Sequence, residues 1–229
     1  MYDNLLQLPL FQGLCKNDFT TILEKVKFNF LSYDKGESIA RQGTPCDRLI
    51  FLLKGEITSH TAYGYPGYAL SETFTAPCTI ETYSLFGKQT LFSASYKAKT
   101  EVKILSIDKS YIFSQLNNYE IFRLNFLNIL SSRCQYLQNK LWIGQNGTLE
   151  EKFVRFMQAR CQHTHGEKNL HITMEELADL IDETRINVSR MLNDMQQKGL
   201  LQLKRKAIAI YDLEALASSL TDERPEQTL

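Results

Sequence analysis

The sequence of 229 residues has few cysteines, and none of them lies in a metal-binding or redox motif. The five are Cys15, Cys46, Cys78, Cys134 and Cys161, and no C-x-x-C pair occurs. Structural zinc and iron–sulfur sites need thiolates that are clustered in this way. An odd number of widely separated cysteines favours reduced, packed thiols over a disulfide framework. We therefore expect no metal site and no cysteine-based redox chemistry.

Long hydrophobic runs are also missing. No apolar stretch approaches the roughly 20 residues of a membrane-spanning helix. The opening residues, MYDNLLQLPLF, lack the basic region and apolar core of a secretory signal. The formal net charge is zero and 23% of the residues are charged, which is ordinary for a globular protein. We expect a cytoplasmic protein of two modest domains.

Catalytic arrangements are equally absent from the sequence. No nucleophile–base pair or carboxylate pair stands out. The segment YGYPGY at 63–68 lacks the glycine spacing and the following helix of a phosphate loop. His163, His165 and His171 fall in an expected polar loop, CQHTHGEKNLH, without an array of further ligands. The sequence therefore favours a binding protein over an enzyme.

The clearest pattern runs from Ile172 to Gly199 and predicts two short helices joined by a tight turn. Thr173 and Glu176 have the spacing of a capping box at the start of the first helix. Thr184 would cap the second helix, which the glycine at 199 would end. Apolar residues recur at helical spacing in both segments, so each helix has one buried face.

The second helix carries residue types that read DNA. An Arg side chain can bond to two acceptors of guanine, Asn can do the same to adenine, and Ser can bond to bases or phosphate. A recognition helix places its first residues in the major groove. The helical residues that we expect to contact DNA are Thr173, Thr184, Arg185, Asn187, Ser189 and Arg190.

A basic hairpin is expected directly after this helix. Two predicted strands flank a tip formed by Lys204, Arg205 and Lys206, which would contact phosphates. From Thr184 to Tyr211 the chain has six cations and one acid, a net charge of plus five. Because phosphate neutralisation dominates affinity for DNA, this local charge favours a winged helix-turn-helix over a hairpin with a solvated charged face.

The first half of the chain predicts a β structure. Short apolar runs alternate with turn residues, and the candidate strands are 28–33, 37–40, 48–53, 56–61, 68–74, 79–85 and 96–107. Many short strands at close spacing are typical of a β-sandwich or jelly roll. A short helix capped by Asn17 or Asp18 should precede them.

A long helix is predicted from about 119 to 143, with a hinge at 144–147. One heptad stripe consists of Leu127, Leu130, Cys134, Leu137 and Leu141. A second stripe consists of Phe122, Phe126, Ile129 and Tyr136. One stripe can pack on the barrel while the other meets a partner, so we expect a dimer. The alternative is a helix that is buried within one subunit.

The order of these parts resembles the Crp/Fnr family of bacterial transcription regulators over nearly the whole chain. The matching segments are LPLFQGL, YDKGESIARQGT, LIFLLKGEI, ITMEELADLIDETRINVSRMLNDMQQKGLL and IAIYD. The resemblance implies an α+β fold: an N-terminal jelly-roll β-barrel with flanking helices, a long dimerisation helix and a C-terminal winged helix-turn-helix. The expected parts are a sensor domain at 1–118, the dimerisation helix and hinge at 119–145, the DNA-binding domain at 146–218 and a disordered tail at 219–229.

The resemblance also implies partners. These are a second copy of the chain, RNA polymerase, and a palindromic duplex whose half-sites lie about 34 Å apart. Arg185 and Arg190 match the family's base- and phosphate-contacting arginines, whereas Ile186 replaces the Glu that many members use to read cytosine. The preferred half-site should therefore differ. A sensor that acts through protein contact without DNA binding stays open as the alternative.

The expected effector pocket departs from the family's pattern. Nucleotide-binding members have a Gly-Glu pair, whose Glu holds the ribose, and an Arg-Ser pair, whose Arg holds the cyclic phosphate. Here Ile80 stands in place of that Gly and Phe92 in place of that Arg. The bidentate phosphate partner is lost, and Ile blocks close backbone approach. We expect no control by cyclic AMP in the usual way and identify no cofactor. The small-molecule effector is unknown: an apolar or unidentified ligand in the barrel and a protein without an effector both stay open. The candidate pocket residues are Glu81, Phe92, Ser93, Leu137 and Gln138.

Overall fold

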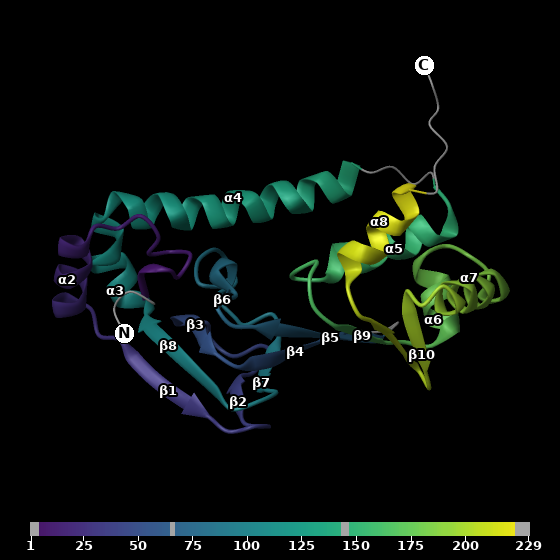
Figure 1. Ribbon diagram of the computed structural model, residues 1–229, viewed down its shortest axis with the longest axis horizontal. Helices are drawn as coiled ribbons and strands as arrows, with labels where there is room; N and C mark the ends of the chain where they lie inside the picture. Colours follow the sequence, from purple (N-terminus) through teal and green to yellow (C-terminus); the bar gives the residue numbers. More distant parts are fainter. Residues whose placement is uncertain (1–4, 65–66, 143–146, 223–229) are drawn as a thin grey trace, which may run out of the picture. The chain divides into compact units, whose positions relative to one another are not determined.

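The computed structural model describes residues 5–64, 67–142 and 147–222, which form two compact units (Figure 1). Unit 1 comprises Met1–Thr58 and Phe74–Tyr136, and unit 2 comprises Ser59–Thr73 and Leu137–Leu229. Each unit has its own hydrophobic core. The fold is α+β, with a β-rich first unit and a helix-turn-helix with wing strands in the second.

Unit 1 contains most of the short strands that the sequence predicts. Its elements, in chain order, are α2 (Lys16–Lys25), β1 (Asn29–Tyr33), β2 (Ser38–Ala40), β3 (Arg48–Lys54), the start of β4 (Glu56–Tyr63), the end of β5 (Tyr68–Thr75), β6 (Cys78–Ile80), β7 (Ser95–Ala98), β8 (Val102–Asp108), α3 (Lys109–Ser114) and most of α4 (Glu120–Trp142). Strands β1, β8, β3 and β6 form an antiparallel sheet in that order. Phe51 on this sheet stacks on Phe11, whose ring also meets Phe122 of α4.

Three local predictions in unit 1 are wrong. The strand expected at 79–85 ends at Ile80 and is followed by a 3₁₀ turn at Thr82–Ser84, because Glu81 adopts a left-handed backbone with φ 41°. The strand expected at 96–107 is two strands, β7 and β8, that pair with different neighbours. Helix α2 is capped by Cys15, whose sulfur accepts a hydrogen bond from the Asp18 amide at 3.3 Å.

The long helix is confirmed as α4, and its two stripes differ in exposure. Phe122 is buried, and Phe126 and Ile129 pack against the core of unit 1. Leu127 is 59% exposed and Cys134 is exposed, while Leu130 is half-buried. The stripe proposed for dimerisation is thus largely uncovered in one subunit. The side chain of Leu141 lies outside the described residues, as do residue 143 at the end of the predicted helix and residues 144–146 of the expected hinge at 144–147.

Unit 2 forms the winged helix. Its remaining elements are α5 (Leu149–Arg160), β9 (Lys168–His171), α6 (Met174–Leu180), α7 (Arg185–Gln197), β10 (Leu201–Lys204), β11 (Ala207–Ile210) and α8 (Leu213–Asp222). The sequence missed β9, which belongs to the expected polar loop. All four residues of β11 are buried because this strand lies between β10 and β9. Helix α8 continues to Asp222, so the tail expected from 219 begins too early, and 223–229 lie outside the described residues.

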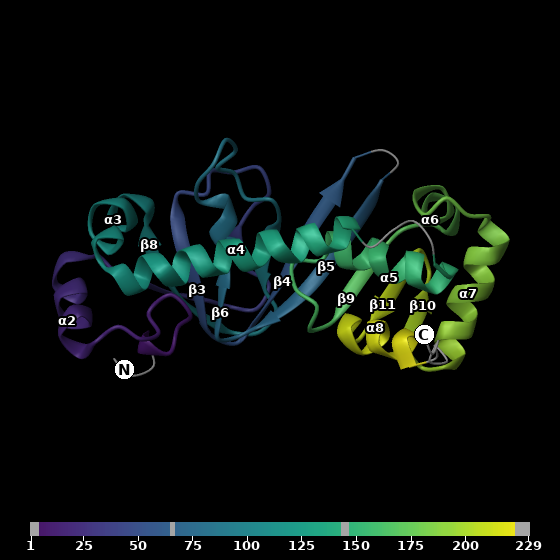
Figure 2. The same ribbon diagram turned by 90° about the horizontal axis from the view of Figure 1, so that it is seen from above.

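A hairpin of strands β4 and β5 joins the winged helix. Strand β5 pairs antiparallel with β9, from Ala69 opposite His171 to Glu72 opposite Lys168, and the two strands lie side by side in both ribbon views (Figures 1 and 2). This pairing explains why Ser59–Thr73 clusters with unit 2, although the sequence places it in the sensor domain. The other expected domain boundaries stay predictions.

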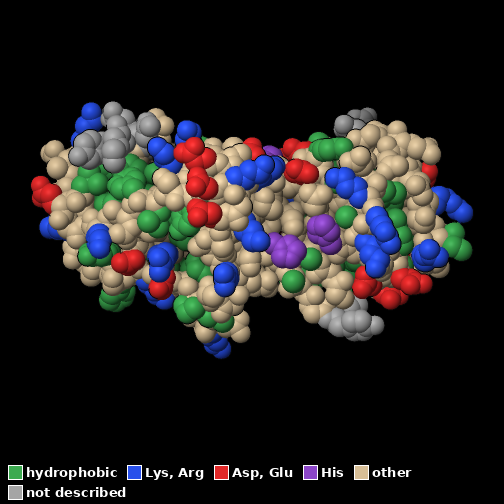
Figure 3. Space-filling model, turned by 90° about the horizontal axis from the view of Figure 1, so that it is seen from below, with side chains coloured by type: hydrophobic (Ala, Val, Ile, Leu, Met, Phe, Trp, Pro, Cys, Tyr) green, Lys and Arg blue, Asp and Glu red, His purple; other side chains and the backbone are tan. Residues whose placement is uncertain are grey.

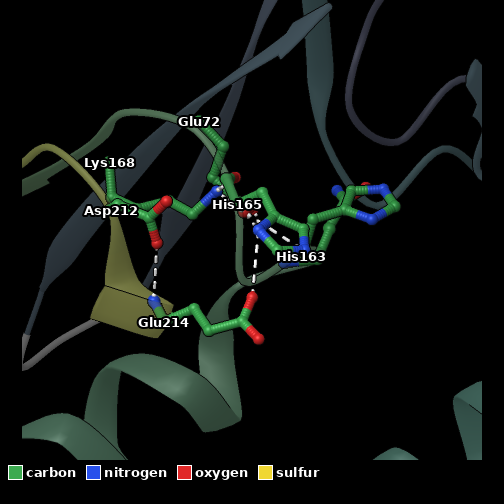
Figure 4. Close-up of polar contacts among 7 residues, drawn as sticks. Glu72, His163, His165, Lys168, Asp212 and Glu214 are labelled. Carbon is green, nitrogen blue, oxygen red and sulfur yellow. Dashed lines mark hydrogen bonds and ion pairs between the residues drawn. The ribbon is translucent and has the colours of Figure 1, made fainter. Parts of the chain in front are cut away.

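A buried ion pair lies where β5 meets β9 (Figure 4). The ammonium of Lys168 is 3.2 Å from a carboxylate oxygen of Glu72, and the two side chains are 1% and 2% exposed. Glu72 also accepts from the Gln162 amide at 3.0 and 2.9 Å, and Lys168 donates to the His165 carbonyl at 2.6 Å. Several polar partners therefore compensate the burial of both charges.

Candidate nucleic-acid interface and effector pocket

Helices α6 and α7 begin at the residues that the sequence predicts. The capping box at Thr173 is confirmed: Thr173 Oγ1 accepts from the Glu176 amide at 3.2 Å, and Glu176 accepts from the Thr173 amide at 2.9 Å. Hydrogen bonds from Thr173 lower the pKa of Glu176. Thr184 caps α7 by accepting from the Asn187 amide at 3.3 Å. These caps fix which residues form the exposed first turn of α7.

The two faces of α7 divide as a recognition helix requires. Val188, Met191, Leu192 and Met195 are buried in the core of unit 2. Arg185, Asn187 and Arg190 are exposed, and Ser189 is half-buried. Ile186 is 70% exposed, so an apolar side chain stands among the polar ones. The exposed face has the chemistry to contact base edges and phosphates, although contact with DNA stays a prediction.

Two of the expected DNA-contacting residues already have partners in the protein. The hydroxyl of Thr173 donates to Glu176 at 2.7 Å while its oxygen accepts the Glu176 amide. Asn187 bonds to Glu183, to which Lys152 of α5 also donates at 2.8 Å. The bond from Lys152, and after it the bond from Asn187, lowers the pKa of Glu183. Asn187 therefore has a carboxylate neighbour within the protein that can compete with a base for its amide.

The wing is confirmed as a two-stranded hairpin beside α7. Strands β10 and β11 pair from Leu201 with Ile210 to Lys204 with Ala207. The turn between them contains Arg205 and Lys206, and all three basic residues at the tip are exposed. The Leu203 amide donates to the Gln196 side chain at 2.7 Å. This hydrogen bond between wing and helix could not be predicted from the sequence. Figure 3 shows Lys and Arg side chains (blue) on the surface of unit 2 that is seen from below.

In unit 1, Glu81 lies in a ring of hydrogen-bond donors. Its first oxygen, Oε1, accepts from Ser93 Oγ at 2.9 Å, the Ala94 amide at 3.0 Å and Tyr96 Oη at 2.9 Å. Its second oxygen, Oε2, accepts from Ser84 Oγ at 2.7 Å and the Ser93 amide at 2.8 Å. The residue is only 3% exposed. The carboxylate that was expected to hold a ribose is thus occupied by its own chain.

Phe92, in the position of the lost Arg, is buried in the core of unit 1. It is buried edge-on to Tyr96 and lines a cavity of about 340 Å³ with Ile50 and Ile104. Arg48 at the edge of this cavity is paired with Asp47 at 2.8 Å. Polar side chains such as Thr44 and Ser106 also line the cavity, but Phe92 itself places an apolar ring where the family's Arg would supply a cation.

The other two candidate pocket residues lie on α4. Leu137 and Gln138 are exposed and cluster with unit 2. Their place in an effector pocket stays a prediction. The described residues contain no group of three or more His, Cys, Asp or Glu that could hold a metal ion. Within the same residues, no helix is long and apolar enough to cross a membrane.

A β-rich sensor unit joined to a winged helix defines a class of transcription regulators that carry their own sensor. Residues 30–119 match the family described as cyclic nucleotide-binding domain, and residues 151–219 match the Crp-like helix-turn-helix domain. The chain belongs to the Crp/Fnr family, which consists of DNA-binding transcription regulators and not of enzymes.

Curated relatives cover most of the chain. A global nitrogen regulator of Synechocystis is 24% identical over 203 residues, which are 83% of this chain and 88% of that protein. A CRP-like cAMP-activated global transcriptional regulator of Mycobacterium tuberculosis is 22% identical over 228 residues, or 95% and 98% of the two chains. Among solved structures, the catabolite activator protein of Thermus thermophilus aligns at 18% identity and a TM-score of 0.49, covering 93% of this chain and 99% of that one.

Proposed function

We propose that this protein is a homodimeric regulator that reads a palindromic DNA site with α7. The observation that carries this is the exposed first turn of α7. This turn presents Arg185 and Asn187, and Arg190 is exposed one turn further on, while Val188, Met191, Leu192 and Met195 are buried; the basic wing tip belongs to the same unit. Arg185 and Asn187 would contact base edges, with Ser189 and Arg190 reaching bases or phosphate. The wing tip at 204–206 would bind phosphates whatever the sequence.

The second subunit would cover the exposed stripe of α4. Leu127 of this stripe is 59% exposed, and Leu124, which precedes the stripe by one turn, is 51% exposed, on a helix whose other face is packed on unit 1. An apolar stripe at heptad spacing loses its contact with water when a second helix packs on it. Two recognition helices held in this way would match a two-fold symmetric operator. Such a regulator would act in the cytoplasm, where it would meet RNA polymerase at promoters.

We also propose that cyclic AMP does not control this regulator in the usual way. One relative is named as cAMP-activated, but two side chains of this chain argue against the same control here. Phe92 offers a phosphate neither charge nor hydrogen bonds, and the Glu81 carboxylate is already occupied by donors of its own chain. A cyclic nucleotide would therefore have to displace these bonds without gaining the guanidinium contact.

The proposal is tested by selecting random duplex DNA with the purified protein and no added ligand. We expect enrichment of a palindrome and an affinity that falls steeply with salt. A further selection with cyclic AMP should return the same sites at the same affinity. Failure to enrich any sequence, even when cell extract is added, would instead support a sensor that works through protein contact.

A further inference from the structure

The ring of donors around Glu81 has the composition of an anion-binding site. Backbone amides of Ser93 and Ala94 and hydroxyls of Ser84, Ser93 and Tyr96 all converge on two oxygen atoms. A buried carboxylate is stable when several donors bond to its charged form. Five bonds from neutral groups of one chain satisfy this requirement without a cation.

The position of Glu81 indicates that the carboxylate is held there against a backbone preference. Its φ of 41° and ψ of 47° lie in the left-handed region of backbone conformation, which residues other than glycine, Asn and Asp rarely adopt. A glycine at 81 would fit this backbone without strain. The five bonds to the side chain compensate this strain.

We propose that Glu81 is a built-in ligand. Its carboxylate fills an anion site, formed by residues 84, 93, 94 and 96, that would bind the carboxylate of a small organic acid if the side chain were absent. The sensor unit thus folds around an internal anion and needs no anionic effector. The inference deepens the proposed independence from cyclic AMP, but its test reads stability and does not depend on DNA binding.

The geometry requires a carboxylate and rejects an amide. Each oxygen of Glu81 accepts one backbone N–H, from Ala94 at Oε1 and from Ser93 at Oε2. A backbone N–H cannot reverse its role, whereas a hydroxyl can. In either orientation, a glutamine at 81 would place its NH₂ against one of these amides. Glu81→Gln should therefore disturb the site although its size is unchanged.

A chain of contacts links the site to the long helix. The hydroxyls of Tyr83 and Ser93 are 3.3 Å apart, and the guanidinium of Arg133 on α4 lies 5.7 Å from the Tyr83 ring centroid. Arg133 also lies over the ring of Tyr136. The occupied site therefore supports the helix on which the dimer stripe lies. Ser93 is exposed, so small anions in solution can reach the site once Glu81 is removed.

The test is chemical rescue of Glu81→Gly in the full chain. This variant removes the carboxylate and relieves the backbone, so its instability reports the missing anion. We expect its Tm to fall by roughly 5–10 °C. Sodium acetate or formate should restore the Tm saturably at roughly 1–50 mM, because so small a ligand binds weakly. Sodium chloride at equal ionic strength should have no such effect.

Two matched controls separate rescue from a general salt effect. Wild type should gain no stability from acetate, since its site is filled. Glu81→Gln should be destabilised and should not respond, since its amide still blocks the site. The proposal is overturned if Glu81→Gly is as stable as wild type, or if acetate and formate fail to restore it. If the variant does not fold alone, the yield of refolded protein in sodium acetate is compared with the yield in sodium chloride. A higher yield in acetate supports the proposal, and equal yields overturn it.

Discussion

The ion pair between Glu72 and Lys168 gives the sharpest prediction about stability. Both side chains are almost fully buried, so removing one partner leaves the other charge without compensation in a low-dielectric interior. Breaking such a pair typically costs about 3–5 kcal/mol. Lys168→Met should therefore destabilise unit 2 by about that amount, and Glu72→Gln should have a similar effect. The bond from Lys168 to the His165 carbonyl is lost in the first variant only.

The double variant Glu72→Met with Lys168→Met makes the reasoning quantitative. Replacing a buried pair by apolar residues of similar volume is often neutral, so the double variant should be more stable than either single one. If unit 2 unfolds in its own transition, a loss of this size corresponds to a fall in its Tm of roughly 15–20 °C, because a unit of about 100 residues has a small entropy of unfolding. Differential scanning calorimetry is suitable because the two units can unfold in separate transitions.

Two outcomes would refute this reasoning. Single losses below about 1 kcal/mol would mean that the pair behaves as a solvent-exposed one. Additive losses in the double variant would mean that the two side chains do not depend on each other. A matched control is Lys99→Met, which removes a half-exposed cation paired with Glu56 at 3.4 Å and should cost little.

Three further predictions concern DNA, assembly and pH. Arg185→Ala should reduce discrimination between selected and random DNA by about 1–3 kcal/mol. Lys206→Ala should instead lower the affinity for all sequences alike and reduce the slope of log affinity against log salt concentration by about one. Binding titrations at several salt concentrations test this, and equal losses of affinity on both kinds of DNA for both variants would contradict the division of roles. Leu127→Asp should convert the dimer to a folded monomer in sedimentation velocity, and an unchanged dimer would exclude the α4 stripe as the interface. The pKa of Glu183 is lowered in the folded protein, so its bonds to Lys152 and Asn187 stabilise the fold above its unfolded pKa, and this contribution is lost as pH falls through the folded value. The free energies of unfolding of wild type and Glu183→Gln should therefore differ at neutral pH and converge in acid. A difference that stays constant with pH would show that ionisation of this carboxylate is not the source of the stability.

The helix starts in unit 2 could be predicted because their causes are local. Thr173 and Glu176 bond across three residues, and Thr184 caps α7 in the same way, so a short window of sequence contains both partners. The basic wing was equally visible, since its charge and strands are consecutive. The DNA-binding residues follow from residue type, from their place in the predicted helix and, for Arg185 and Arg190, from the family resemblance. None of these reveals that Asn187 lies against the Glu183 carboxylate.

The missed features depend on residues that are distant in sequence or on unusual backbone. Strand β9 is short and polar, and the strand β5 that pairs with it is about a hundred residues earlier. The register that places Glu72 opposite Lys168 appears only in the fold. Glu81 could be aligned with a family position, but nothing in the sequence indicates a left-handed backbone or a carboxylate turned towards Ser93. Cys15 was missed as a cap because thiols seldom serve as one.

The DNA-binding unit is discontinuous along the chain, because the hairpin of β4 and β5 pairs with β9. A fragment that begins at Leu137 would present β9 as a free strand edge and would bury Lys168 without Glu72. Free edges of this kind pair with other chains, so such a fragment should aggregate. For the same reason, the C-terminal part could not be exchanged with that of another regulator at a single crossover. A working chimaera would have to take both residues 59–73 and the C-terminal winged helix from the same parent, because the two segments form one unit although they are separate in the sequence.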